Sequence, residues 1–328
     1  MRKIYILLAV FVGMLTACNK DDHALVVTAK PTLFEYVNTD PQLTLFRAAC
    51  QRAGMLNDST FATAGPYTLF APLDSAMQAA GLTTEKIGSM APATLAGIVQ
   101  YHIVQGKLGS DNLVGFYSQY VHCQHPRYQP LVTKNYYGIF INGIAVVQGN
   151  IPAGDGIIHK INRVALPPTG TMTDFINNAP DLTMFAATLR ILGVDGYLAM
   201  PDPVDQVRKA SQFLADSTMT VLAPTDAAFR TYGYADTNAL KQVDPEQIHH
   251  IFDYYFNLNT VFSAAMKGGM IWGIPWFNLQ SARERHFRVL ADGFTITADG
   301  NITPIHIIRA DNVANNGVVH VVDQVIVP

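Results

Sequence analysis

The residues best suited to chemistry by type and spacing are His122, Cys123 and His125, which lie within four positions of one another. Imidazole and thiolate groups are ligands that zinc prefers, and three of them could form most of a tetrahedral site. A structural zinc site needs a fourth ligand, and none follows at a familiar spacing. We therefore interpret this stretch as an irregular surface loop, and we predict neither a metal nor another cofactor.

A second candidate for chemistry is the pair His249 and Asp253, four residues apart in a segment with helical spacing. Such residues share one helix face, so a hydrogen bond between them is expected. A catalytic dyad would also need a nucleophile and an oxyanion site. The sequence has no nucleophile-elbow motif, no Walker loop and no dinucleotide-binding fingerprint. Because these motifs are missing, we predict that the protein is not an enzyme. An enzyme would also need a deep pocket with polar groups converging around His249 or His102.

Two aromatic stretches could bind a ligand. Residues 115–130 are rich in Tyr and His, and residues 268–277 contain both Trp residues. Aromatic rings stack on sugar faces and anchor protein contacts, because they offer a large area with few rotatable bonds. The alternative is that the second stretch closes the hydrophobic core. The candidate binding residues are Tyr117, Tyr120, Tyr128, Trp272 and Trp276.

The composition limits the possible classes of function. The chain has 328 residues, of which 49% are hydrophobic and 14% are charged. This length and composition predict about two domains with packed cores. The formal net charge is −3, and no basic block is present. We therefore predict no binding to nucleic acid, which normally leaves a footprint of Lys and Arg.

The first seventeen residues are predicted to be a lipoprotein signal peptide. Arg2 and Lys3 give a positive start, and residues 4–15 form an apolar run that is short for a membrane span. The sequence LTAC ending at Cys18 resembles a bacterial lipobox, which implies cleavage before Cys18 and a diacylglyceryl group on its sulfur. The alternative is an ordinary secretory signal. Residues 18–30 would then be the lipidated Cys and its tether, anchored in the outer membrane by the acyl chains.

The residues after Cys18 predict which way the protein faces. Asn19-Lys20-Asp21-Asp22 is similar to the surface-export signal of Bacteroidota lipoproteins, and the alternative is a solvated tether. We predict an outer membrane lipoprotein exposed on the cell surface, whose partner is an unidentified surface protein or polysaccharide. Cys50 lies in an apolar helical pattern and is predicted to be a buried free thiol rather than half of a disulfide.

A ten-residue stretch that occurs twice organises the chain. The copies are Thr68–Met77 (TLFAPLDSAM) and Thr220–Phe229 (TVLAPTDAAF). In each, an apolar run passes through Ala-Pro to an Asp followed by residues that tolerate a helix. Because proline cannot donate to a strand ladder, a buried strand is predicted to end there and a helix to begin. Asp74 and Asp226 are predicted to act as structural caps at the start of these helices.

Other segments recur in the same order. Residues 43–55 resemble residues 182–194 at a separation of 139 (182 − 43), and the Ala-Pro motifs are 152 apart (223 − 71). The tails at 156–167 and 317–328 are 161 apart (317 − 156). A separation that grows in steps indicates a tandem duplication with loop insertions. The Pro-rich stretch 200–207 is predicted to be one such surface loop.

Each half is predicted to be an α+β domain. The order is a helix, a buried strand, further helices and then several strands with Asn-Gly or Asp-Gly turns, which favours helices segregated from a largely antiparallel sheet. A boundary is predicted around Pro167 and Gly170, with the next helix near Thr173 and either Thr173 or Asp174 as its cap. We assign the domains to residues 31–168 and 169–328.

With these motifs in place, the chain resembles the fasciclin family, or FAS1 domain, twice. The two ten-residue stretches resemble the first family box, and the two tails resemble the second. A Tyr-His pair typical of the family is matched by Tyr101-His102 in the first half, whereas Tyr254-Tyr255 occupies the aligned place in the second. The residues that match the family motifs are Thr68, Ala71, Pro72, Asp74, Tyr101, His102, His159, Thr220, Ala223, Pro224, Asp226 and His320.

The resemblance implies a compact β-sandwich wedge flanked by helices in each domain, used outside the cell for adhesion or matrix interaction. Some animal members engage integrins near the Tyr-His region, but this chain has no Arg-Gly-Asp sequence. The residues themselves favour His102, His159 and His320 as core or edge histidines with hydrogen-bond partners. We predict a non-enzymatic cell-surface lipoprotein that mediates adhesion or protein–protein or matrix interaction. The alternative is a carbohydrate-binding accessory protein of a glycan-uptake system.

Overall fold

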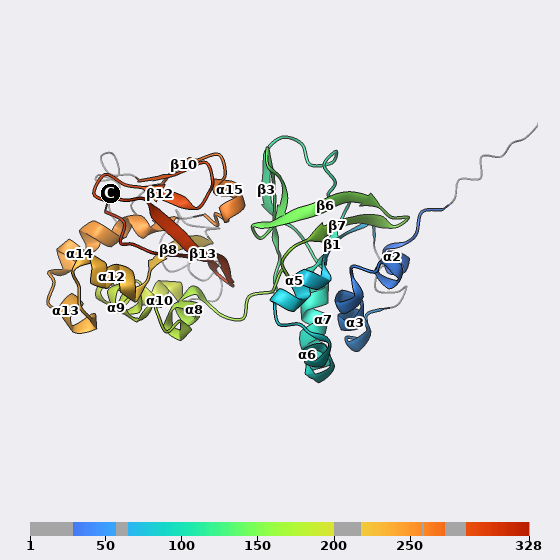
Figure 1. Ribbon diagram of the computed structural model, residues 1–328, viewed down its shortest axis with the longest axis horizontal. Coiled ribbons are helices and arrows are strands. Elements are labelled where there is room, and N and C mark those ends of the chain that lie inside the picture. The colour runs from blue at the N-terminus through green and yellow to red at the C-terminus, as the bar shows by residue number, and fades with distance from the viewer. Residues whose placement is uncertain (1–28, 57–64, 200–217, 258, 273–286, 328) are drawn as a thin grey trace, which may run out of the picture. The chain divides into compact units, whose positions relative to one another are not determined.

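Figure 1 shows the computed structural model of the chain, which describes residues 29–56, 65–199, 218–257, 259–272 and 287–327. The predicted signal peptide, Cys18, the loop at 200–207 and Trp276 lie outside these residues. The described residues form two halves, each with several helices and one seven-stranded sheet. The predicted α+β class with two tandem domains is confirmed.

The first half begins with helices and ends with strands. Thr32 caps its first helix, and Glu35 completes a capping box with it, which fixes where that helix begins. The helices are α2 (Leu33–Thr39), α3 (Thr44–Arg52), α5 (Asp74–Ala79), α6 (Thr84–Ser89) and α7 (Pro92–Tyr101). The strands are β1 (Tyr67–Pro72), β2 (Ile103–Gln105), β3 (Tyr117–Tyr120), β4 (Leu131–Asn135), β5 (Gly138–Ile141), β6 (Ile144–Pro152) and β7 (Gly156–Ile161).

The sheet of the first half is built around β1. Its strand order is β2-β1-β7-β6-β5-β4-β3, and β1 pairs in parallel with β7, from Tyr67 opposite Gly156 to Pro72 opposite Ile161. The other pairs are antiparallel. Every residue of β1 is buried, and Pro72 is its last residue. The prediction of a buried strand that ends at the proline is therefore confirmed.

The second half repeats this arrangement. Its sheet has the order β10-β11-β12-β13-β14-β8-β9, and β14 pairs in parallel with β8 as β7 does with β1. No helix within the described ranges is long and apolar enough to cross a bilayer. The helices are α8 (Met172–Asn178), α9 (Thr183–Ile191), α10 (Asp195–Leu198), α12 (Asp226–Tyr232), α13 (Thr237–Lys241), α14 (Pro245–Phe252), the 3-10 helix η1 (Asp253–Tyr255) and α15 (Ser263–Met266). The strands are β8 (Met219–Pro224), β9 (Phe256–Asn257), β10 (Met270–Trp272), β11 (Phe287–Val289), β12 (Thr295–Thr297), β13 (Ile305–Ala314) and β14 (Gly317–Val322).

Each sheet curls at one bulged strand. The pairing of β6 with β7 and of β13 with β14 contains register shifts, and bulges of this kind increase the local twist. Asn150 in β6 and Asp311 in β13 have φ values of 58° and 60° at corresponding places. In Figure 1, β3 runs across the direction of β6 and β7. The predicted sandwich is thus formed by a single sheet that folds over at its bulged strand.

Apolar residues pack on both sides of the first sheet. Leu69 belongs to the cluster formed with α2, α3 and α7, whereas Phe70 belongs to a second cluster formed with β4 and β5. Successive residues of a strand face opposite sides, so a strand buried on both sides needs an unbroken apolar run. Cys50 in α3 is fully buried, and burial raises the pKa of its thiol to about 12. The predicted buried free thiol is confirmed.

The predicted cap of one helix is wrong. Helix α8 begins at Met172, because Thr171 rather than Thr173 is its N-cap. The Thr171 hydroxyl accepts from the Asp174 amide at 3.1 Å, and the Asp174 carboxylate accepts from the Thr171 amide at 2.8 Å, which makes a capping box. Helix α7 ends at Tyr101, since β2 begins at Ile103 and pairs with β1.

Candidate functional site

The aspartates shared by the two copies, Asp74 and Asp226, each hold a neighbouring helix. The Asp74 carboxylate accepts hydrogen bonds from the Thr44 hydroxyl at 2.6 Å and from the Leu45 amide at 2.8 Å. Asp226 accepts the corresponding pair from the first turn of α9 at 2.7 and 2.8 Å. The amides of a first helical turn have no partner within their helix, and they attract a carboxylate. The prediction of a structural cap was correct, but the prediction that each Asp caps its own helix was wrong.

The threonines that open the two copies hold a loop. The Thr68 hydroxyl donates to the Gly106 carbonyl at 2.6 Å and accepts from the Leu108 amide at 2.8 Å. The Thr220 hydroxyl makes the same two bonds, at 2.6 and 2.8 Å, to the corresponding loop after β9. Both side chains are fully buried. A hydroxyl can donate and accept at the same time, which gives the motif a physical reason for threonine at this place.

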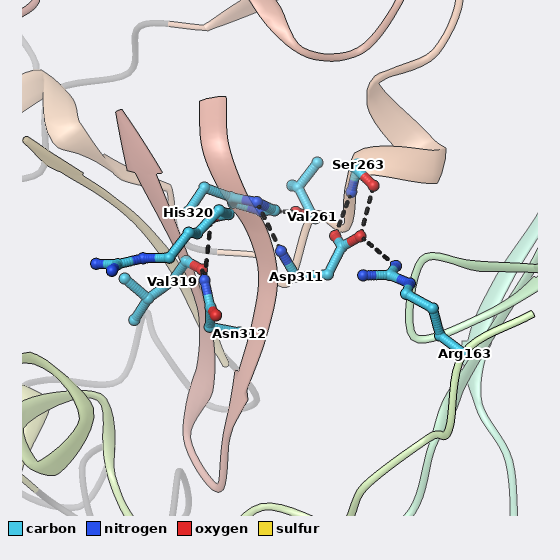
Figure 2. Close-up of polar contacts among 8 residues, drawn as sticks. Arg163, Val261, Ser263, Asp311, Asn312, Val319 and His320 are labelled. Carbon is cyan, nitrogen blue, oxygen red and sulfur yellow. Dashed lines mark hydrogen bonds and ion pairs between the residues drawn. The ribbon is translucent and has the colours of Figure 1, made fainter. Parts of the chain in front are cut away.

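His159 and His320 connect this loop to the bulge of the sheet. The Nδ1 atom of His320 accepts from the Asp311 amide at 3.1 Å, and its Nε2 atom lies 2.8 Å from the Val261 carbonyl, as Figure 2 shows. His159 makes the equivalent contacts at 3.2 and 3.0 Å. Because Nδ1 accepts from a backbone amide, each ring is neutral and carries its proton on Nε2. Burial lowers the pKa of both imidazoles.

The bulge residue beside each histidine holds a serine. The Asp311 carboxylate accepts from the Ser263 amide at 2.7 Å and from the Ser263 hydroxyl at 2.6 Å (Figure 2). Asn150 bonds the Ser110 amide and hydroxyl, both at 2.9 Å. Asn and Asp tolerate the positive φ of this position better than other residues with a side chain. Arg163 also approaches the Asp311 carboxylate, at 3.3 Å.

The Tyr-His pair and its Tyr-Tyr counterpart perform the same structural task. His102 is fully buried, with Nδ1 2.7 Å from the Ile98 carbonyl and Nε2 accepting from the Ala165 amide at 3.1 Å. At the aligned place, the Tyr255 hydroxyl donates to the Ile326 carbonyl at 2.9 Å and accepts from the amide of the same residue. Both side chains therefore fasten the segment that follows the last strand of their half. Burial lowers the pKa of His102 to about 4.

The remaining motif residues are buried or end a strand. Tyr101 is buried, and the Asn142 amide donates to its hydroxyl at 3.0 Å. Ala71 and Ala223 are fully buried in β1 and β8, and Pro72 and Pro224 are the last residues of these strands. These contacts agree with the prediction that His102, His159 and His320 are core or edge histidines with hydrogen-bond partners. A role for the motif residues in binding a partner stays a prediction.

The candidate binding aromatics lie in different environments. Tyr117 and Tyr128 are half-buried and pack against the core of the first half. Tyr120 is exposed, and its hydroxyl lies 2.8 Å from the Thr260 hydroxyl. Trp272 is the last residue of β10, but its side chain, like the whole of Trp276, lies outside what the structure describes. The alternative that the 268–277 stretch closes the hydrophobic core stays a prediction.

The His122, Cys123 and His125 stretch closes on itself. The His125 Nδ1 atom accepts from the Tyr128 amide at 3.0 Å, and His122 Nδ1 lies 3.0 Å from the Gln129 side-chain amide. The Cys123 thiol lies 3.2 Å from the Tyr128 carbonyl, and burial raises its pKa to about 11. Within the described ranges, no three His, Cys, Asp or Glu side chains are placed to hold a metal ion.

Three features of the described residues were not found by sequence reasoning. One is the buried ion pair between Lys160 and Asp40, whose Nζ and carboxylate atoms are 2.6 Å apart. The others are the exposed apolar residues Val114 and Tyr136, which lie near Phe116 of the 115–130 stretch, and a pocket beside α14. The ion pair joins residues far apart in sequence, which no local pattern reveals. The Tyr-Tyr dipeptide in the turn after β4 and the Tyr-Gly-Tyr at the end of α12 were the available signals for the other two.

The fold and the repeated hydrogen bonds of the motif residues together define a protein made of two copies of one helix-and-sheet domain. The fasciclin domain model matches residues 41–167 and 199–328. The chain therefore belongs to the fasciclin family and carries two FAS1 domains, which confirms the resemblance.

The relatives are distant. Human periostin is 26% identical over 58% of this chain and 20% of its own length, and Drosophila melanogaster fasciclin-1 is 22% identical over 82% and 42%. The fasciclin-like arabinogalactan protein elcF of Phaeosphaeria nodorum is 23% identical over 92% and 90%. The solved FAS1 domain pair of the insect cell adhesion molecule fasciclin I is 15% identical with a TM-score of 0.38, over 87% of this chain and 96% of that chain. The chain spans less than half the length of the animal proteins periostin and fasciclin-1.

Proposed function

We propose that this protein is a non-enzymatic cell-surface lipoprotein that mediates adhesion through protein–protein contact. Membership of the fasciclin family supports an adhesion-type role. The motif side chains are engaged in hydrogen bonds within each domain, which favours binding over catalysis. The contact with a partner then depends on residues that the fold leaves exposed.

The observation that carries the proposal is a set of exposed apolar side chains at one edge of the first sheet. Phe116 is 68% exposed and Tyr136 is 98% exposed, and Val114 is exposed with them. Strand β3 pairs with β4 with Tyr117 opposite Lys134, so Phe116 lies near the turn that holds Tyr136. We call these three residues the Phe116 cluster. Exposed apolar clusters of this kind mark interaction surfaces more often than isolated exposed residues do.

The place of the cluster suggests what binds there. Strand β3 is the last strand of its sheet, and among the described residues no further strand pairs with it. Its outer backbone groups can pair with an extended segment of a partner protein, while the apolar side chains add specificity. The partner is therefore a protein that offers a strand with apolar side chains.

Replacing Phe116 and Tyr136 together by serine should reduce adhesion of cells that display the protein roughly tenfold. The reason is that truncated apolar anchors no longer exclude water from the contact. The measurement is the fraction of cells displaying the protein that stay attached, under flow, to a layer of cells that carry the partner.

Ile302→Ser is the matched control, because Ile302 is fully exposed and belongs to the second half, far in sequence from the Phe116 cluster. It should leave attachment unchanged. Equal attachment of the double variant and the unaltered protein would rule out the Phe116 cluster as the adhesive surface.

The anchoring part of the proposal depends on the LTAC sequence that ends at Cys18. Cys18→Ala should move the protein from the membrane fraction to the soluble fraction, because the diacylglyceryl group needs the thiol. Immunoblots of fractionated cells measure this, and protease treatment of intact cells measures surface exposure. Cys50→Ala should stay in the membrane fraction. A Cys18→Ala protein that still partitions wholly into membranes would show that the anchor is something else.

A further inference from the structure

The second half has an open pocket of about 610 Å³ beside α14. Sites for small ligands have volumes in this range. Two tyrosines at and just beyond the end of α12 and three polar residues of α14 contribute most of its lining. They are Tyr232, Tyr234, Glu246, Gln247 and His250.

The two tyrosines are held in a fixed relation. Gly233 between them has a φ of 118°, a conformation that favours glycine and ends α12. The rings of Tyr232 and Tyr234 are 5.6 Å apart and inclined at 46°. Tyr234 also packs against the buried ring of Phe229, 6.4 Å away, whereas Tyr232 is 40% exposed. One ring is therefore braced against the core, and the other is open to a ligand.

The polar residues are available to a ligand. Glu246, Gln247 and His250 are exposed, and within the described residues their side chains form no hydrogen bond. The buried residues Ile248 and Phe252 fix the rotation of α14 by packing in the core. A carboxylate, an amide and an imidazole together accept and donate, as neighbouring hydroxyl groups of a ligand require.

The first half shows that the fold does not need these residues. The start of α12 lies 152 positions after that of α5 (226 − 74), and that of α14 lies 153 after α7 (245 − 92). The residues at the places of Tyr232, Tyr234, Glu246, Gln247 and His250 are Ala80, Leu82, Ala93, Thr94 and Gly97. None of these offers an aromatic ring, and only Thr94 has a polar side chain. The side chains that line the pocket are thus particular to the second half.

The lining limits the class of ligand. The described residues that line it include Glu246 and neither Lys nor Arg, which disfavours phosphate, sulfate and acidic sugars. A purely apolar ligand would desolvate the three polar side chains without replacing their hydrogen bonds with water. A neutral sugar satisfies both conditions, since its ring face packs on an aromatic ring and its hydroxyl groups bond polar side chains.

We propose that the pocket formed by Tyr232, Tyr234, Glu246, Gln247 and His250 binds a neutral saccharide. This site is separate in sequence from the Phe116 cluster, so the adhesive function can fail while the saccharide site stands, and the reverse is also true. It also differs from the tryptophans and the Tyr117–Tyr128 stretch that the sequence offered for sugar binding.

The test uses the full chain and a panel of neutral oligosaccharides of glucose, xylose, mannose, galactose and arabinose, followed by calorimetry with the best ligand. Tyr232→Ala should weaken its affinity at least tenfold, and Glu246→Ala should weaken it by a smaller factor. Phe294→Ala is the matched control, because Phe294 is an aromatic residue of the same half with 38% exposure. Its affinity should equal that of the unaltered chain.

Thermal unfolding of each variant verifies that the second half is folded. Loss of affinity in Tyr232→Ala and Glu246→Ala, with Phe294→Ala unaffected, supports the site. The proposal is overturned if no neutral oligosaccharide of the panel binds. It is equally overturned if Tyr232→Ala binds as tightly as the unaltered chain, or if acidic sugars of the same size bind more tightly than neutral ones.

Discussion

Lowering the pH from 7 to 4 is expected to destabilise the first half by about 3 kcal/mol through His102 alone. In the fold the pKa of His102 is lowered from 6.5 to about 4, because burial disfavours the charged ring. The unfolded chain binds the proton more readily, so the stability is complete above pH 6.5 and is lost as the pH falls toward 4. His159 acts in the same direction, since burial lowers its pKa as well.

Urea unfolding at pH 7 and pH 4 measures this effect. Both tryptophans, Trp272 and Trp276, belong to the second half, so their fluorescence follows that half while circular dichroism follows the whole chain. His102→Gln keeps a group that can accept from the Ala165 amide but does not titrate. It should be less stable at pH 7 and should lose less stability between pH 7 and pH 4 than the unaltered chain.

The matched control is Tyr255→Phe, at the place aligned with His102. Burial raises the pKa of Tyr255 well above 10, so its hydroxyl is protonated at both pH values. The loss of its bonds to Ile326 should therefore lower stability equally at pH 7 and pH 4. If His102→Gln shows the same pH dependence as the unaltered chain, the neutral buried ring of His102 is not what makes the first half sensitive to acid.

The fold could be predicted wherever one residue type has a single structural consequence. Pro72 and Pro224 end their strands because they lack an amide hydrogen. The Asn142-Gly143 dipeptide makes the turn between β5 and β6, where both residues have positive φ. The cap of α8 was misplaced because Thr171, Thr173 and Asp174 all suit a helix start, and only the reciprocal bonds between Thr171 and Asp174 decide between them.

The contacts of the motif residues could be predicted less well, because they join distant segments. The bulges at Asn150 and Asp311 follow from bonds to Ser110 and Ser263, which lie in another part of each half. His102 in the first half and Tyr255 in the second occupy aligned places, although histidine and tyrosine are not similar residue types. This correspondence becomes intelligible only when both side chains are seen to bond the backbone after the last strand.

Asp226→Ala is expected to destabilise the second half by about 2–4 kcal/mol. The carboxylate accepts from the Thr183 hydroxyl and the Met184 amide, and Asp226 itself is buried. Alanine leaves that buried amide without a partner and removes the negative charge from the start of α9. Urea unfolding followed by tryptophan fluorescence measures the change.

The repeat supplies the controls for this prediction. Asp74→Ala makes the same change in the first half and should shift the circular dichroism transition but not the fluorescence transition. Asp236→Ala removes an exposed cap of α13, which bonds the Asn238 and Ala239 amides, and should cost about 1 kcal/mol or less. An Asp226→Ala loss no larger than that of Asp236→Ala would mean that the fastening of α9 by Asp226 contributes little. The shared aspartate would then need a reason outside the stability of the domain.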